Sequence, residues 1–343
     1  MERRTPVAVV LFQLGGPDSL EAIEPFLYNL FSDPDIIDFP FSRFARSPLA
    51  KLIAASRARK VQEHYSQIGG KSPILDNTLA QACALEKHLA DQLDARVFVA
   101  MRYWHPLTES VVRELEKGNF KTIVLLPLYP QYSKTTTGSS LNEWTRRVST
   151  SPVRQLTVKV IKQFYTSPLY LDAIVEKVGD SLNGLTGNWK ETHLVFSAHG
   201  IPLSVVQAGD PYQSQIEATV DLIMRRGGWS LPWTLCYQSK VGASRWLQPS
   251  LHETLKHLAS TGVEQVFVVP ISFVSDHVET LNEINIEARK QARALGIRNF
   301  VMVAGLNDSP KFISALADLV LEAVGVEPCN DLETAVCSPL ASL

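Results

Sequence analysis

Residues 265–285 read QVFVVPISFVSDHVETLNEIN, an apolar run that ends abruptly in a segment rich in carboxylates. The run is continuous rather than alternating, which is typical of a strand buried on both faces of a sheet. Similar short runs recur along the chain and alternate with amphipathic stretches. They read VAVVLFQL, ARVFVAM, TIVLLPLY, LTVKVI, THLVFSAH, WTLCY, QVFVVPIS and NFVMVAG. This alternation predicts an α/β fold with parallel sheets covered by helices.

The chain also carries a weak internal repeat. The stretch VVLFQLGGP resembles LVFSAHGIP, and KTIVLLPLYPQYS resembles EQVFVVPISFVSD. Each copy is a strand followed by a similar turn, and the first half has extra residues between Asp33 and Asp76. We therefore expect two similar Rossmann-like domains that face each other across a cleft, with a helical insertion, the lip, near residues 33–76. The expected bounds are 1–160 plus about 306–326 for the first domain, 161–305 for the second and 327–343 for a tail.

The composition argues against several classes of protein. The chain has 343 residues, of which 45% are hydrophobic, so it can bury a sizeable core. A net charge of −2 gives no global attraction to nucleic acid. No uncharged stretch approaches the roughly 20 residues needed to span a bilayer, and the first apolar run is interrupted by Gln13, unlike a signal peptide. The four cysteines form no CxxC pair, so we expect a cytoplasmic protein, with Cys83 and Cys236 as buried, inert thiols.

Two predicted strand ends carry residue types suited to acid–base chemistry. His199 ends HLVFSAH, and Glu279 follows VFVVPIS. The carboxyl ends of parallel strands line the ligand crevice, so these two side chains would converge. A helix beyond Asp276 would place Glu279, Glu283 and Glu287 on one face, where like charges repel by roughly 0.2 to 0.5 kcal/mol per pair. A second interpretation stays open, in which Asp276 and Glu279 form a capping box on a solvated helix.

The standard metal and nucleotide motifs do not match. HVETLNE is not HExxH, and a His/Glu metal hydrolase would need a third stable ligand that we do not find. GGPDSLE lacks both GxGxxG and GK[ST]. The hydroxyl-rich segment Pro130–Trp144 fits either helix capping by Ser139 or Ser140 or an anion contact. Arg102, just after a strand, fits either a surface charge or a ligand contact.

Seven longer motifs together resemble one family. They read LGGPDSLEAIEPFLYNLFSDPDII, QEHYSQIGGKSPI, MRYWHP, LYPQYSKTTTGSSLNE, FSAHGIPLSVVQAGDPY, YQSKVG and VVPISFVSDHVETLNEINIE. In these motifs the chain is similar to the ferrochelatases, lyases that insert Fe²⁺ into a porphyrin and release two protons. The resemblance runs from about Val7 to about Val324. It implies two similar α/β domains with a cleft between them, and protoporphyrin IX conversion to protohaem, the last step of haem biosynthesis.

The resemblance also implies a set of site residues. It makes His199 and Glu279 the central pair that faces the porphyrin nitrogens and the usual iron site. His199 is the expected proton acceptor, because an unperturbed imidazole has a pKa of about 6.5. Asp276, His277 and Glu283 would form an acidic line leading from Glu279. The implied porphyrin contacts are Leu14, Arg57, Tyr65, Ser72, Arg102, Tyr103, Tyr129 and Ser133.

The expected partners follow from the same resemblance. Porphyrin and ferrous iron are the substrates, and no cofactor is bound permanently. Some family members carry a [2Fe–2S] cluster, which needs four thiolates; Lys134 occupies the corresponding loop position here and the tail supplies only Cys329 and Cys337, so we expect no cluster. Leu14, where members that use coproporphyrin are expected to have Tyr, favours protoporphyrin. The alternatives are a coproporphyrin ferrochelatase and a non-catalytic tetrapyrrole- or iron-binding protein of the same fold. The tryptophan that animal members place before QSKVG is Tyr237 here.

The lip mixes aromatic and basic residues and has two interpretations. It is either an ordinary amphipathic helical pair or a surface that contacts an apolar anionic ligand or a membrane. Under the second interpretation, the lip would make peripheral contact with a membrane.

Overall fold

The computed structural model describes residues 6–36, 42–184, 191–240 and 244–327, without the side chains of residues 42–45. The first sheet contains β1 (Val7–Gln13), β2 (Ala95–Met101), β3 (Thr122–Pro127) and β4 (Thr157–Val160), in the order β2-β1-β3-β4. The second contains β5 (His193–His199), β6 (Trp233–Gln238), β7 (Gln265–Pro270) and β8 (Asn299–Met302), in the order β6-β5-β7-β8. All neighbouring strands are parallel. The predicted fold class is confirmed.

The two sheets repeat each other in register as well as in order. Phe12 of β1 pairs with Pro127 of β3, and Ser197 of β5 pairs with Pro270 of β7. Two residues beyond these pairs, the first sheet has Leu14 and the second has His199. The weak repeat in the sequence therefore reflects a structural repeat that places two predicted site residues at equivalent strand ends.

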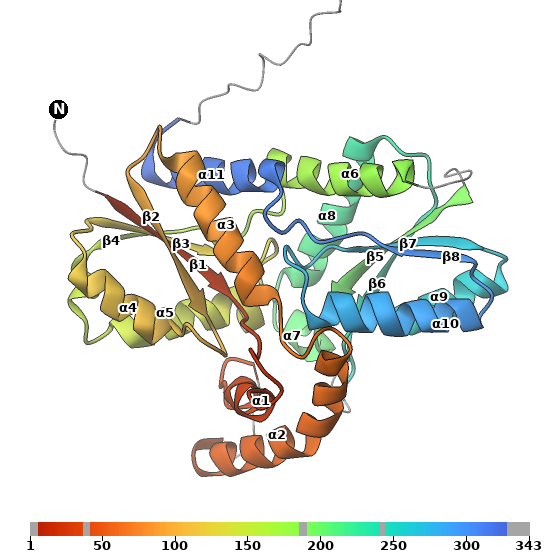
Figure 1. The fold of residues 1–343 in the computed structure, drawn as a ribbon, viewed down its shortest axis with the longest axis horizontal. Coiled ribbons are helices and arrows are strands. Elements are labelled where there is room, and N and C mark those ends of the chain that lie inside the picture. Colours follow the sequence, from red (N-terminus) through yellow and green to blue (C-terminus); the bar gives the residue numbers. More distant parts are fainter. Residues whose placement is uncertain (1–5, 37–41, 185–190, 241–243, 328–343) are drawn as a thin grey trace, which may run out of the picture.

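Helices cover both faces of each sheet (Figure 1). The helices are α1 (Ile23–Phe31), α2 (Ser42–Ser66), α3 (Ile74–Leu89), α4 (Thr108–Lys117), α5 (Ser139–Val148), α6 (Pro168–Asn183), α7 (Leu203–Gln207), α8 (Tyr212–Gly227), α9 (Leu251–Ser260), α10 (Arg289–Ala294) and α11 (Pro310–Val324). Three further helical segments, none of them an α-helix, are η1 (Lys134–Gly138), η2 (Pro152–Gln155) and η4 (Glu279–Ala288). Of these, η1 and η4 are π-helices, and each follows the third strand of its own sheet.

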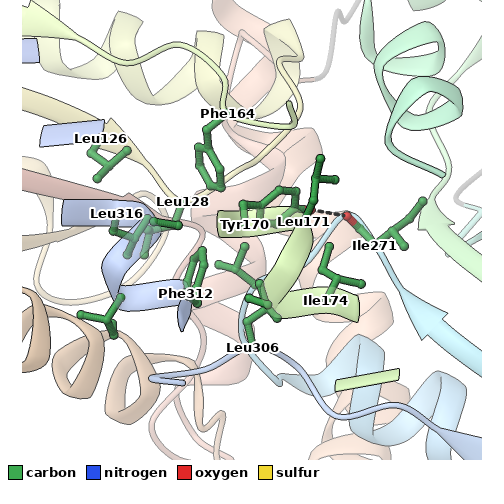
Figure 2. Close-up of a cluster of buried hydrophobic side chains, with 14 of the residues drawn as sticks. Leu126, Leu128, Phe164, Tyr170, Leu171, Ile174, Ile271, Leu306, Phe312 and Leu316 are labelled. Carbon is green, nitrogen blue, oxygen red and sulfur yellow. Dashed lines mark hydrogen bonds between the residues drawn. The ribbon is translucent and has the colours of Figure 1, made fainter. Parts of the chain in front are cut away.

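The inner faces of the two sheets share one hydrophobic core. Leu11 of β1 and Phe196 of β5 belong to the same cluster, together with residues of α3, α6, α8 and α11. Figure 2 shows the part of this core around Tyr170, whose hydroxyl donates to the carbonyl of Ile271 at 3.3 Å. Phe312 of α11 lies in the same cluster. A shared core of this kind fixes the two sheets relative to each other.

The outer faces have separate cores. Val10 and Phe12 pack beneath α4 and α5, whereas Val195 and Val266 pack beneath α9 and α10. After β8 the chain returns to the first sheet and forms α11 beside α3 and α6 (Figure 1). α11 packs against helices of both predicted domains, and the residue bounds of the domains stay a prediction.

The lip contains α2, which lies with α1 beyond the strand ends of the first sheet (Figure 1). Phe26 and Phe31 of α1 pack with Ala50 and Ala54 of α2 in a small cluster of their own. Leu52 on α2 is 67% exposed. Residues 37–41 of the insertion lie outside the described residues. Within the part of the chain that the structure describes, no helix is long and apolar enough to cross a membrane.

Candidate active site

The ends of β5 and β7 bring His199 and Glu279 together. His199 Nε2 lies 3.8 Å from Glu279 Oε1. The backbone of His199 is held on both sides, since its N–H donates to Ser272 Oγ at 2.9 Å and its carbonyl accepts from Tyr212 Oη at 2.9 Å. The His199 side chain is 34% exposed and the Glu279 side chain 20% exposed, so both remain open to a ligand.

Glu279 lies between two imidazoles. His277 Nε2 is 3.7 Å from Glu279 Oε2, and the His277 side chain is only 5% exposed. His277 Nδ1 lies 3.1 Å from the carbonyl of Ser275. Because a carbonyl can only accept, Nδ1 carries a proton and Nε2 is directed to Glu279.

The electrostatic surroundings keep Glu279 ionised. Burial raises the pKa of its carboxyl group, but His199 and His277 outweigh burial, and the net pKa is below its ordinary value. Glu279 Oε2 is buried and has no hydrogen-bond partner among the described residues. An ionised carboxylate oxygen left without a donor is suited to receive a cation or a proton.

Glu283 differs from Glu279 in its titration. Burial, followed by the neighbouring Glu279, raises the pKa of Glu283 to about 7, and the hydrogen bond from Ser239 only partly offsets this. Ser239 Oγ donates to Glu283 Oε2 at 2.5 Å. A carboxyl group with a pKa near 7 exchanges protons readily at neutral pH.

The capping-box interpretation of Asp276 and Glu279 is wrong. The backbone N–H of Asp276 donates to Asn307 Oδ1 at 2.9 Å and not to Glu279. The Asp276 carboxylate accepts from Thr280 Oγ1 at 3.1 Å and from the N–H of Gly305 at 3.2 Å. Glu279 is therefore free to face His199, on the first turn of a π-helix, a rare geometry that is frequent at functional sites.

A second cluster lies at the end of β2. Tyr103 Oη donates to Asp33 Oδ2 at 2.6 Å, and Arg102 Nη2 lies 2.9 Å from the same oxygen. Ser139 Oγ also donates to Asp33 Oδ2, at 2.6 Å. Burial raises the pKa of Asp33, but Ser139, Tyr103 and Arg102 outweigh it and lower the pKa overall. Neither sequence interpretation of Arg102 anticipated this buried ion pair, and Asp33 was not among the predicted site residues.

Three predicted contacts belong to the insertion near residues 33–76. Tyr65, in the last turn of α2, is 2% exposed, and burial together with the charge of Glu279 raises its pKa. Arg57 is farther out, with its guanidinium carbon 5.6 Å from the centre of the Phe31 ring. Ser72 is buried and its N–H donates to the carbonyl of Pro17.

The remaining predicted contacts follow β1 and β3. Leu14 and Tyr129 are half-buried. Ser133 is fully buried, and its hydroxyl oxygen accepts from the N–H of Thr135 and caps η1. The following helix α5 has Gly138 as its N-cap residue and no side-chain cap, so the expectation of capping by Ser139 or Ser140 is wrong. The Ser133 hydroxyl also donates to Asp210 Oδ2 at 3.0 Å.

Comparison with known proteins identifies the family. The family model described as Ferrochelatase matches residues 6–324. The chain belongs to the ferrochelatase family. A protein named Ferrochelatase from Aquifex aeolicus is 48% identical over 92% of this chain and 99% of its own, and one from Synechocystis is 46% identical over 94% and 84%. The chain is thus a lyase with ferrous iron and a porphyrin as substrates.

The fold of this chain also occurs in proteins of low sequence identity. A sirohydrochlorin chelatase, SirB from Bacillus subtilis subspecies spizizenii, solved in complex with cobalt, superimposes with a TM-score of 0.53 at 13% identity. The match covers 93% of this chain and 96% of that one. The two proteins share the fold, and at this identity nothing more follows.

The cysteines that bear on a cluster are only partly described. Cys236 in β6 is buried, and burial raises the pKa of its thiol to about 12, as expected for an inert thiol. Cys83 in α3 is exposed, so the expectation of burial was wrong for it, because it lies on the solvent face of the helix. Cys329 and Cys337 lie outside the described residues, and Lys134 begins η1. The absence of an iron–sulfur cluster stays a prediction.

Proposed function

We propose that this ferrochelatase inserts Fe²⁺ into protoporphyrin IX and forms protohaem, with His199 and Glu279 as the central pair. The observation that carries this proposal is the position of the Glu279 carboxylate between two imidazoles, with one oxygen that has no hydrogen-bond partner among the described residues. The reaction exchanges two pyrrole protons for one Fe²⁺. The site therefore needs proton acceptors and a weak ligand for iron, which these residues supply.

Each residue has a distinct proposed role. His199 accepts a pyrrole proton, because its backbone is anchored and its ring is accessible. Glu279 receives iron or the second proton, and His277 holds Glu279 in place. Glu283, with a pKa near 7, passes protons outward. We assign Asp276 a supporting role in place of the predicted place in the acidic line, because its carboxylate is engaged with Thr280, Gly305 and Asn307.

The proposed porphyrin contacts come from both the first domain and the lip. Leu14 stands at the strand end equivalent to that of His199, so each sheet supplies one central residue. The apolar Leu14 side chain cannot bond a polar ring substituent, which favours protoporphyrin over the more acidic coproporphyrin. The other proposed contacts are Arg57, Tyr65, Ser72, Arg102, Tyr103, Tyr129 and Ser133.

Anaerobic insertion assays with each porphyrin test this proposal. Purified protein is mixed with Fe²⁺ and either protoporphyrin or coproporphyrin, and metalloporphyrin formation is followed by absorbance. We expect a higher kcat/KM with protoporphyrin. Preference for coproporphyrin would reverse the substrate assignment, and porphyrin binding without any metalloporphyrin would support the non-catalytic alternative.

We further propose that the protein acts in the cytoplasm and contacts a membrane peripherally through the lip. The exposed Leu52 on α2 lies among basic residues, a combination that suits an anionic lipid surface. Sedimentation with anionic and neutral vesicles tests this, and equal recovery of the protein with both would show that the basic residues do not contribute to membrane binding.

We propose that no [2Fe–2S] cluster is bound, which iron and sulfide analysis of the purified protein checks.

A further inference from the structure

Asn307 lies in the turn between β8 and α11, and each of its polar groups is bonded. Its Oδ1 accepts from the N–H of Asp276 at 2.9 Å, and its Nδ2 donates to Asp276 Oδ2 at 3.0 Å. Its own N–H donates to the carbonyl of Val274 at 2.8 Å. Its carbonyl accepts from Gln81 Nε2 at 2.9 Å. One residue thus joins the segment before η4 to α3 of the other domain.

The backbone of Asn307 restricts which residues can take its place. Its φ angle is +46°, in the left-handed region that Asn adopts more readily than most other residues. The side chain must also supply one acceptor and one donor, which an amide does and a carboxylate does not. The position therefore demands both a conformation and a hydrogen-bonding pattern.

The segment that Asn307 holds sets the orientation of His277. Gln81, fully buried on α3, donates to Ser275 Oγ at 3.0 Å as well as to the Asn307 carbonyl. The carbonyl of Ser275 in turn accepts from His277 Nδ1. Moving the Ser275 peptide would therefore rotate the imidazole whose other nitrogen faces Glu279.

The approach of the β8–α11 turn to Asp276 is close. A Cβ atom on Gly305 would lie 3.0 Å from the Asp276 nitrogen and 3.2 Å from its Cγ. The Asp276 carboxylate accepts from Gly305, Asn307 and Thr280. It stands just before η4, where the free N–H groups of a helix favour negative charge. The turn and Asp276 together support the start of the helix that carries Glu279.

We propose that Asn307 is a positioning residue for iron insertion, which holds Ser275 and Asp276 so that His277 keeps Glu279 in its reactive place. This inference rests on the proposed function of Glu279. Asn307 itself touches no substrate and acts through His277 and Glu279.

The test compares kcat with porphyrin binding in Asn307→Asp. This variant keeps the size of the side chain and the acceptor for the Asp276 N–H, but it replaces the donor by a second carboxylate. We expect kcat to fall by about 10²-fold, the loss typical of a displacement near 1 Å, with the porphyrin Kd unchanged. The double variant Asn307→Asp/Asp276→Asn exchanges donor and acceptor, so it should recover most of the lost kcat.

A matched control is Asn299→Asp. Asn299 lies on β8 and donates to Gln265 Oε1 at 3.0 Å, so the same chemical change breaks an amide hydrogen bond away from η4. We expect its kcat to equal that of the parent protein. If Asn307→Asp is not recovered as folded protein, Asn307→Gly keeps the left-handed φ without the side chain and serves in its place.

The outcomes separate the two proposals. A parent-level kcat in the folded Asn307 variant, whether Asn307→Asp or its substitute Asn307→Gly, would overturn the inference and leave the proposed function intact. The inference would also be overturned if kcat and porphyrin binding fell together and the double variant restored neither, because a joint loss indicates a general loss of structure. Failure of the unmodified protein to insert iron would overturn the proposed function instead.

Discussion

Replacing Glu279 by Gln removes the central negative charge with almost no change in shape. The two imidazole nitrogens lie 3.8 and 3.7 Å from its oxygens. At such distances one charged pair is worth roughly 4 kcal/mol at an effective dielectric constant of about 20, so the charge dominates the local field. Loss of a positioned proton acceptor costs about 10² to 10⁴ in rate. We therefore expect kcat to fall within that range, an increase in the barrier of about 3 to 5 kcal/mol.

Stability and porphyrin binding should respond differently from kcat. Removing the charge loses its attraction to the imidazoles but also relieves its burial, and these effects oppose each other. We expect a Tm within a few degrees of the parent and a porphyrin Kd within about tenfold. Anaerobic steady-state assays, thermal unfolding and porphyrin fluorescence titration measure the three quantities.

The matched control is Glu287→Gln, two turns along the same helix, where the side chain is 52% exposed and lies 3.5 Å from His64 Nε2. It should leave kcat unchanged. Parent-level turnover in Glu279→Gln would refute the assignment of Glu279 and reduce the FVSDHVETLNEIN segment to a structural helix.

Three further predictions concern the base, the proton route and the lip. His199→Ala should nearly abolish iron insertion and leave the porphyrin Kd within about an order of magnitude; measurable turnover close to the parent would remove His199 from the mechanism. Folding raises the pKa of Glu283 from 4.5 to about 7, so the native state binds the Glu283 proton more tightly than the unfolded state does. Glu283 therefore contributes stability that is fully present below pH 4.5 and is lost as the pH rises through 7. Urea unfolding from pH 4 to 8 should show this loss of stability, at most about 3 kcal/mol, in the parent protein but not in Glu283→Gln, and parallel stability curves for the parent and the variant would contradict the assignment. The iron KM of Glu283→Gln should rise, with a smaller defect in kcat than that of Glu279→Gln. Arg57→Ala should raise the porphyrin KM severalfold and leave the iron KM alone, whereas an unchanged porphyrin KM would return Arg57 to the role of a lip charge packed on Phe31.

Much of the fold follows from local patterns in the sequence. The short apolar runs predicted all eight described strands. β1 and β7 are buried throughout, as a continuous apolar run indicates, whereas the edge strand β4 is exposed along its whole length. The repeat of LGGP and HGIP indicated equivalent strand ends, and the register of the two sheets bears this out. The convergence of His199 and Glu279 was also predictable from the sequence, because parallel neighbouring strands end at the same edge of a sheet.

The long-range hydrogen bonds were decided only by the tertiary structure. Asp33 and Arg102 are separated by 69 positions in the chain, and no local pattern marks them as partners. The same is true of Asn307, which holds Asp276 from the far side of β8, and of Ser239, which bonds Glu283 from the end of β6.

Patterns within a few residues were enough to predict where the strands lie and which strand ends carry His and Glu, whereas the exposure of β4 at the edge of its sheet was not predicted. Only the folded chain decided which carboxylate stays charged. Glu279 and Glu283 are four residues apart on one helix, yet two imidazoles lower the pKa of the first, while burial and its neighbour's charge raise that of the second. The lowering groups are His199 on β5 and His277 in the loop before η4, and burial and charge at such a site depend on what the whole chain brings near it.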